Sequence, residues 1–328
     1  MCGKAGTRRV AILGGIDEAG FGPLLGPLVV SSAVFSVPEP LAEADLWSQL
    51  RRSVGRTRRH LAGRLLIADS KKAFDRSQGL GHLERTVRAA LRCLGHEPAD
   101  VNGLLAVLCP DCLPRLTGYP WYQDLGGCPL PACTADLRIA SQVFADDLEA
   151  CGGRVTALRS CCFDVGHFNR IVEQVRNKSQ VLFIAAAQLI QQVLAACPDE
   201  NVYILVDRQG GRAHYREHLL RSFPGMDLRI LREGPESSAY ELQDGRRTVR
   251  LRFEVSADDH HLPVSLASMV SKYVRELLME RVNGHFARLD ASLRPTAGYW
   301  KDGQRFVQEV RRRLPDLPID GRLLIRSR

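Results

Sequence analysis

Residues 16–27 read IDEAGFGPLLGP and place two adjacent carboxylates, Asp17 and Glu18, at the end of an apolar run. That run, residues 10–16, predicts a buried strand, and the glycines that follow predict a sharp turn. Carboxylates beside a buried strand are costly unless they face a cation or solvent. The stretch therefore indicates a site, although an ordinary strand-to-turn corner with surface acids explains it equally well when it is taken alone.

The glycines of the turn bear on whether the two acids can act together. Neighbouring side chains on a strand point to opposite faces, so Asp17 and Glu18 converge only if the chain turns between or just after them. Gly20 and Gly22 permit that turn and leave backbone N–H groups uncovered. A sugar or a phosphate group could then approach the main chain closely.

The composition is that of a globular chain with a moderate basic excess. The 328 residues are 45% apolar and 25% charged, and the net charge is +8. The length allows one large domain or two, and the charge suits a polyanionic partner without requiring one. Without a long apolar run or a signal-peptide pattern, we expect a cytoplasmic protein that does not associate with membranes.

Ten cysteines are many for that compartment, and we expect core residues or metal ligands rather than disulfides. Four of them (Cys109, Cys112, Cys128 and Cys133) lie in a segment rich in Pro, Gly and aromatic residues. This segment, about residues 101–135, predicts an irregular insertion. The first pair has zinc-ligand spacing, but the second is spaced differently and is accompanied by prolines. A loop without zinc is therefore the preferred interpretation.

Two further strands are predicted to lead into acids. Residues 202–207 end on Asp207 before a glycine-containing break, and residues 248–255 lead into Asp258 and Asp259. Carboxylates at three strand ends are hard to explain as exposed surface residues, because each acid near the sheet would need a partner. A divalent-metal site is the economical explanation.

Other segments complete an α/β pattern. Residues 28–35 are expected to run antiparallel to the first strand because the connection is short. Residues 228–231 and 248–255 are expected to form a hairpin, and a long helix is predicted from Pro263 through residue 286. A third segment, residues 65–73, reads LLIADSKKA. Its polar residues suit either a phosphate contact or a plain helix cap with surface lysines.

Two of these motifs resemble type 2 ribonuclease H (ribonuclease HII), in the pattern of its archaeal and eukaryotic members. Residues 17–23 match the family's DEAGRGP, and residues 69–72 match its DSKK. Asp207 matches the third family acid, and the helix pattern at residues 267–276 selects Asp258 over Asp259 as the fourth. Residues 298–302 match a GYPSD-like segment loosely.

The resemblance implies a ribonuclease H-like mixed β-sheet flanked by helices. Residues 1–262 would form the catalytic domain, and residues 263–328 a helical substrate-binding part. It implies a monomeric endonuclease that uses two Mg²⁺ or Mn²⁺ ions to hydrolyse the RNA strand of RNA–DNA hybrids, or to cut at ribonucleotides embedded in duplex DNA. The implied catalytic and metal-binding residues are Asp17, Glu18, Asp207 and Asp258; the implied substrate-binding residues are Gly20, Phe21, Gly22, Ser70, Lys71, Lys272 and Tyr299.

Three departures from the family pattern leave the substrate preference open. Phe21 replaces an arginine, Arg208 replaces a glycine, and Ser256 replaces a basic residue. All three affect the handling of nucleic acid rather than metal ligation. Two alternatives remain: a nuclease of the same fold that acts on another DNA structure, and a nucleic-acid-binding module with a decayed site. Retention of all four acids favours an enzyme.

Overall fold

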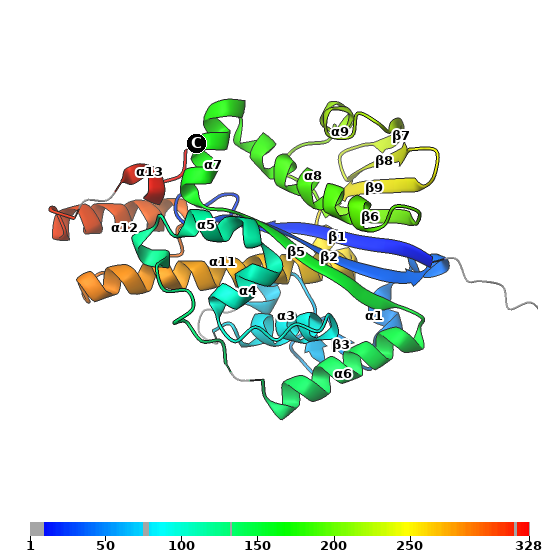
Figure 1. The fold of residues 1–328 in the computed structure, drawn as a ribbon, viewed down its shortest axis with the longest axis horizontal. Helices are drawn as coiled ribbons and strands as arrows, with labels where there is room; N and C mark the ends of the chain where they lie inside the picture. The colour runs from blue at the N-terminus through cyan, green and yellow to red at the C-terminus, as the bar shows by residue number, and fades with distance from the viewer. Residues whose placement is uncertain (1–9, 75–78, 132, 318–319, 328) are drawn as a thin grey trace, which may run out of the picture.

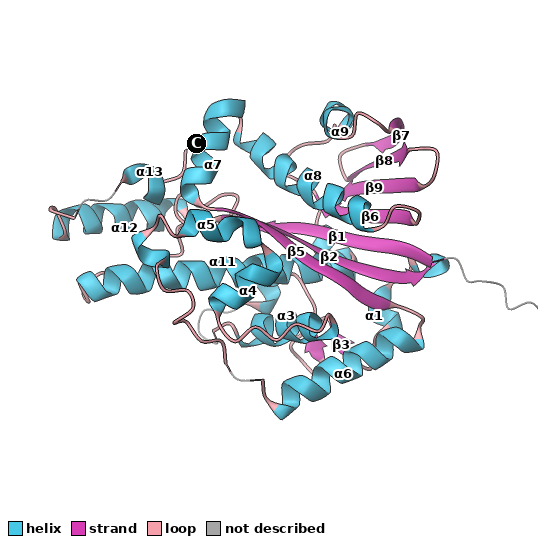
Figure 2. Cartoon of the chain, viewed as in Figure 1, coloured by secondary structure: helices cyan, strands magenta, loops and turns pink. Residues whose placement is uncertain are grey.

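The computed structural model describes residues 10–74, 79–131, 133–317 and 320–327. A seven-stranded sheet forms the centre of the molecule, and helices cover both of its faces (Figures 1 and 2). In spatial order the strands are β5 (Arg154–Phe163), β2 (Leu28–Pro38), β1 (Val10–Ala19), β6 (Asn201–Asp207), β9 (Thr248–Glu254), β8 (Ser237–Gln243) and β7 (Asp227–Glu233).

The two faces of the sheet belong to two hydrophobic cores. On β1, Ala11 and Leu13 pack into one core, whereas Ile12 and Ile16 pack into the other. Burial on both faces explains why this strand reads as a continuous apolar run. The first core is covered by α3 (Gly81–Cys93), α4 (Val101–Leu108), α6 (Ala135–Ala150), α11 (Leu262–Leu289) and α12 (Trp300–Arg313), and the second by α7 (Val165–Val175), α8 (Lys178–Ala196) and α9 (Arg216–Ser222).

Short elements connect this framework. They are η1 (Glu39–Leu41), α1 (Leu46–Gln49), the parallel pair β3 (Val54–Gly55) and β4 (Leu65–Leu66), α2 (Ser70–Ala73), η2 (Pro110–Cys112), α5 (Leu113–Leu116), η3 (Pro120–Tyr122), α10 (Ala257–His260) and α13 (Gly321–Leu324).

The cysteine-bearing segment contains α4. The Asp100 carboxylate caps the first turn of this helix by accepting from the Gly103 N–H at 2.7 Å. The segment therefore contains more helix than its composition indicates.

Strand directions confirm the predicted fold class. β1 is antiparallel to β2 and parallel to β6, which is parallel to β9, so the sheet is mixed. The expected antiparallel partner of the first strand is confirmed as well. The predicted hairpin of residues 228–231 with 248–255 is wrong, because β8 lies between β7 and β9 and pairs with both. β8 escaped the pattern because buried polar residues, among them Ser237, Ser238 and Glu241, interrupt its apolar ones.

Among the described residues one helix, α8, is long and apolar enough to cross a membrane by length and composition. It packs against the sheet, and its buried residues include Leu182, Ala186 and Ile190, which belong to the second core. Burial of this kind is what a core helix shows, and the length of α8 is accounted for by the strands that it covers.

Close contact between α11 and β1 depends on a glycine. A Cβ atom added at Gly15 would lie 2.1 Å from the carbonyl carbon of Pro263, at the start of α11. No side chain fits there without moving the backbone of the helix. The helix that begins the predicted C-terminal part is thus packed directly on the central strands.

Gly15→Ala should lower the free energy of unfolding by about 2 kcal/mol or more, because overpacking against backbone cannot be relieved by a rotamer change. Gly14→Ala is the matched control, since its Cβ would lie no nearer than 3.4 Å from any of its neighbours, the Ile204 side chain and the Tyr203 carbonyl oxygen. Urea unfolding of both variants checks this. Equal losses would contradict the close approach of α11.

Candidate functional site

Carboxylates from two parallel strands meet at one end of the sheet. Ile16 on β1 lies opposite Val206 on β6, so the residues that follow them end the two strands side by side. Asp17, Glu18 and Asp207 each offer a carboxylate oxygen, and these oxygens lie within 4.8 Å of one another. Hard oxygen donors at this separation suit Mg²⁺ or Mn²⁺.

The fourth acid, Asp258, is not among the three that converge within 4.8 Å, but its charge acts on Asp17 and Glu18 from a helical turn rather than from a strand end. β9 ends at Glu254, and Asp258 lies on the one-turn helix α10, so the expectation that a third strand ends in the acids is wrong. A left-handed conformation at Ser256 (φ 54°) turns the chain, and the Ala257 N–H donates to Asp207 Oδ1 at 2.8 Å. Asp259 forms an ion pair with Lys72 instead.

Burial and like charge oppose ionisation of all four acids. The pKa of Asp17 lies well above its usual value because the carboxyl is buried and faces the other three. Burial and the Asp207 charge raise the pKa of Glu18 to about 7. Burial, with Asp69 and Asp207, raises the pKa of Asp258 to about 7, and burial raises the pKa of Asp207. Cations would relieve this repulsion, so the four residues fit a metal centre.

Asp69 is a fifth acid that the sequence interpretation did not assign to the site. Its carboxylate caps α2 by accepting from the Lys71 N–H at 2.9 Å, and it also hydrogen-bonds Asp258. Although burial lowers the pKa of Lys71, the charges of Asp69, Asp258, Asp17 and Asp207 outweigh it and raise that pKa. The second motif therefore contributes both a cation and an anion to the cluster.

Buried hydroxyl groups of α11 hold the end of β1. Ser271 Oγ donates to the Asp17 carbonyl at 2.9 Å and lies 2.8 Å from Ser31 Oγ. One turn earlier, Ser268 Oγ donates to Ser70 Oγ at 3.0 Å. Because Ser70 is buried in this contact, its side chain does not face solvent as a phosphate ligand would.

The glycine turn lies against the start of α12. The backbone of Leu24 donates to the Gly298 carbonyl at 2.7 Å, which brings the half-exposed Tyr299 beside the turn. Gly20 has φ +92°, and a Cβ atom there would lie 2.5 Å from Arg275 Nε. Gly22 is exposed and has no atom within 4 Å of its ideal Cβ, so it leaves the turn open to a ligand.

Lys272 is already engaged within the protein. Its ammonium pairs with Glu276 at 2.8 Å and lies 4.6 Å from the centre of the Phe74 ring. Lys71 is exposed and makes no ion pair within the described ranges, so it is the better placed of the two cations to meet a phosphate. Sequence periodicity could not distinguish Lys71 from Lys272, because their different availability for a phosphate comes from tertiary neighbours.

The four cysteines of the insertion have different neighbours. Cys109 and Cys112 approach each other, with 3.6 Å between their sulfurs. Cys128 lies 2.7 Å from a guanidinium nitrogen of Arg281, and Cys133 lies 4.0 Å from one of Arg92. All nine cysteines in the described part of the chain are free thiols. The four cysteines therefore do not share one set of neighbours, and the absence of zinc stays a prediction.

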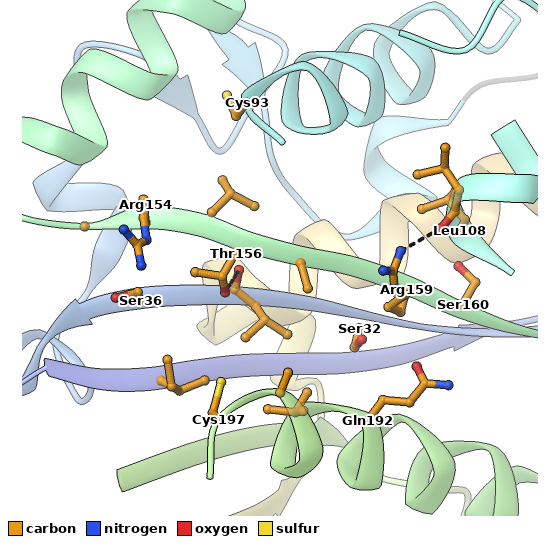
Figure 3. A pocket seen from close by; sticks show the side chains of 18 of the residues that line it. Ser32, Ser36, Cys93, Leu108, Arg154, Thr156, Arg159, Ser160, Gln192 and Cys197 are labelled. Atoms are coloured by element: carbon orange, nitrogen blue, oxygen red, sulfur yellow. Dashed lines mark hydrogen bonds between the residues drawn. The ribbon is translucent and has the colours of Figure 1, made fainter. Parts of the chain in front are cut away.

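A cavity of about 1240 Å³ lies along the edge strand β5, apart from the acid cluster (Figure 3). Arg159 lines it and donates to the Val107 carbonyl at 2.7 Å. Its lining includes none of Asp17, Glu18, Asp207 and Asp258. This hollow is therefore not part of the candidate metal centre.

No family model and no curated protein sequence matches the chain. Among solved structures, ribonuclease HII from Archaeoglobus fulgidus, in a complex with PCNA, shares 16% identity over 97% of this chain and 94% of its own, with a TM-score of 0.47. Ribonuclease H2 from Pyrococcus horikoshii shares 15% identity over 95% and 92%, with a TM-score of 0.48.

A third structure, Bst ribonuclease HIII in complex with Mn²⁺, shares 16% identity over 92% of this chain and 62% of its own, with a TM-score of 0.38. These neighbours are type 2 and type 3 ribonucleases H. They are the group that the two sequence motifs resemble. With identity and TM-score this low, the argument for function depends on the site itself.

The acid cluster should make the metal-free protein less stable as the pH rises. Because the pKa of Glu18 is about 7 in the folded state and near 4.5 in the unfolded state, this carboxyl costs no stability below about pH 4. The cost grows as the pH rises from about 4.5 to 7 and is complete by about pH 8. Glu18→Gln should therefore raise the free energy of unfolding at pH 8 by on the order of 1–3 kcal/mol, with little gain at pH 4.

Urea unfolding in the presence of a chelator, at both pH values, measures this gain. The exposed Glu236 provides the control substitution Glu236→Gln. A gain for Glu18→Gln that does not change with pH would show that the carboxylates do not repel one another as the geometry indicates.

Proposed function

We propose that this chain is a metal-dependent endonuclease of the ribonuclease H type, which cuts the RNA strand of RNA–DNA hybrids or the strand at a ribonucleotide embedded in duplex DNA. The convergence of Asp17, Glu18 and Asp207 within 4.8 Å carries the proposal. Asp258 is joined to them through the Ala257 contact. Four acids that raise one another's pKa are poorly suited to a metal-free structural role.

The residues of the cluster have distinct tasks in this proposal. Asp17, Glu18, Asp207 and Asp258 would hold two Mg²⁺ or Mn²⁺ ions. When bound, such ions supply an activated water molecule and stabilise the departing 3′ oxygen. The ammonium group of Lys71 would face the phosphate and offset part of its charge. The hydrogen bond from Ala257 keeps the Asp207 carboxylate oriented.

Recognition of the ribose would depend on the turn and on Tyr299. The 2′-hydroxyl is the group that distinguishes RNA from DNA, and backbone N–H groups of the open Gly20 to Gly22 turn can contact it. Tyr299 is 53% exposed beside that turn and can pack on a sugar. The predicted C-terminal part, which begins at residue 263, would contact the substrate, because Tyr299 precedes the first residue of α12.

Asp17→Asn and Asp207→Asn should each reduce cleavage by at least ~10²-fold, because an amide removes a metal-bound charge. Their folds should persist with equal or greater stability, since each substitution relieves repulsion. The assay compares a duplex that carries one ribonucleotide, an RNA–DNA hybrid, an all-DNA duplex, a branched DNA and a single-stranded DNA, with Mg²⁺ or Mn²⁺.

The outcome of this assay separates the candidate functions. Cutting of the ribonucleotide-containing substrates alone supports the proposal. Equal cutting of a branched or single-stranded DNA would favour a nuclease for another structure, and binding without any cutting would indicate a non-catalytic module. Loss of folding together with activity in both variants would make the acids structural residues.

Tyr299→Ala should remove the preference for a ribonucleotide-containing duplex over an all-DNA duplex. We expect affinities that differ in the parent protein to become equal, measured with Ca²⁺ in place of the catalytic metal and at one salt concentration. Tyr299→Phe keeps the ring and should keep the preference. A preference that survives Tyr299→Ala would show that the ribose is read elsewhere.

A further inference from the structure

A second hollow lies beside the glycine turn and has no role in the proposed chemistry. It has a volume of about 330 Å³, and we call it the turn pocket; its lining includes Phe21, Phe168, Lys178, Trp300 and Arg326. This volume is near the lower end of the range for small-ligand sites, which is about 300–1000 Å³. The turn pocket therefore suits a ligand the size of one nucleotide rather than a duplex.

Arg326 brings a buried cation to the turn pocket. Its side chain is 3% exposed, and one guanidinium nitrogen donates to the carbonyl oxygens of Gly20 and Pro23. The other two nitrogens, Nε and Nη1, are buried without a hydrogen-bond partner. Burial, with the nearby Arg275, lowers the pKa of Arg326 to about 9. A buried guanidinium that lacks a counter-ion favours an anionic ligand.

Lys178 adds a second positive charge. It is the first residue of α8, a helix of 19 residues whose N-terminal end carries a partial positive charge. Its ammonium lies 5.6 Å from the centre of the Phe21 ring and forms no ion pair with any described residue. An anion in the turn pocket would meet both Lys178 and Arg326.

Aromatic rings supply the apolar part of the turn pocket. Trp300 is 40% exposed at the start of α12, and the half-buried Phe21 occupies the turn itself. Exposed aromatic rings interleaved with cations are the combination that binds single-stranded nucleic acid, since the rings stack on bases and the cations contact phosphates. A simple anion would not use the rings.

We propose that the turn pocket binds one unpaired nucleotide of the substrate, with its base against Trp300 and Phe21 and its phosphate facing Lys178 and Arg326. The inference rests on the proposed function, because the same turn connects the pocket to Asp17 and Glu18. It also assigns a role to Phe21, which replaces the arginine of the family motif. The preferred substrate would carry its ribonucleotide beside a flap or a frayed end.

Binding to six duplexes tests this substrate preference. They are all-DNA or carry one ribonucleotide, and each is made either fully paired or with one unpaired nucleotide next to the central position, on the 5′ or the 3′ side in separate ligands. Affinity is measured by fluorescence anisotropy with Ca²⁺ at one salt concentration. In the parent protein the unpaired nucleotide should tighten binding by about tenfold, the size of one stacking contact.

Trp300→Ala should abolish that gain, and Trp300→Phe should restore most of it. Lys178→Ala should reduce the gain and lower the salt dependence of binding by about one phosphate contact. Ile139→Ala is the control, because Ile139 is 64% exposed on α6 and does not line the turn pocket. Thermal unfolding of each variant establishes that it is folded.

Two results would overturn the inference. One is equal affinity of the parent protein for paired and unpaired duplexes on both sides; the other is a loss in Trp300→Ala that is the same for every ligand. Neither would affect the proposed function if the fully paired ribonucleotide duplex is still cut with Mg²⁺. Absence of that cutting, with the stacking gain intact, would instead remove the proposed function and leave a nucleotide-binding site.

Discussion

Repulsion among carboxylates held at the ends of β1 and β6 is the constraint on which the rest of the site depends. The parallel register places Asp17 and Asp207 side by side, and the burial of Asp17 with the partial burial of Asp207 limits screening of their charges by water. Hydrogen bonds from other elements hold the acids in place despite this cost. Ser271 holds the Asp17 backbone, and Ala257 holds the Asp207 carboxylate. Such bracing is what a preorganised cation site requires.

The far end of the chain takes part in this arrangement. Ile325 forms an isolated bridge with Leu25, and the Arg326 N–H donates to the Leu24 carbonyl at 2.9 Å. Asn169 holds the same segment by accepting from the Ser327 N–H at 2.7 Å. The last residues of the chain thus brace the turn that follows the first two acids. These contacts join segments from the two ends of the sequence.

Local patterns were enough to find the acids and the main strands. The apolar run before Asp17 and the strand that ends at Asp207 are visible because burial on both faces removes polar residues from them. The predictions that were wrong concern features that tertiary contacts determine. Buried serines interrupt the apolar pattern of β8, so the strand could not be predicted. The position of Asp258 depends on a left-handed conformation at Ser256, which the residue types there do not predict.

Side-chain partners were the least predictable part of the candidate site. Lys272 and Ser70 have the residue types of phosphate ligands, but a glutamate one helical turn away holds the first and Ser268 covers the second. Asp69 looked like a helix cap, and it is one, yet the fold also places it against Asp258. Sequence spacing fixes neighbours along an element, whereas these contacts join elements far apart in the chain.

The most direct test of the account is the number and position of divalent ions at the four acids. A crystal of the protein with Mn²⁺ and an RNA–DNA hybrid, measured at a wavelength where manganese scatters anomalously, would show them. The account predicts two peaks about 4 Å apart, contacted by Asp17, Glu18, Asp207 and Asp258. An absence of manganese from these carboxylates, with the hybrid bound, would contradict it.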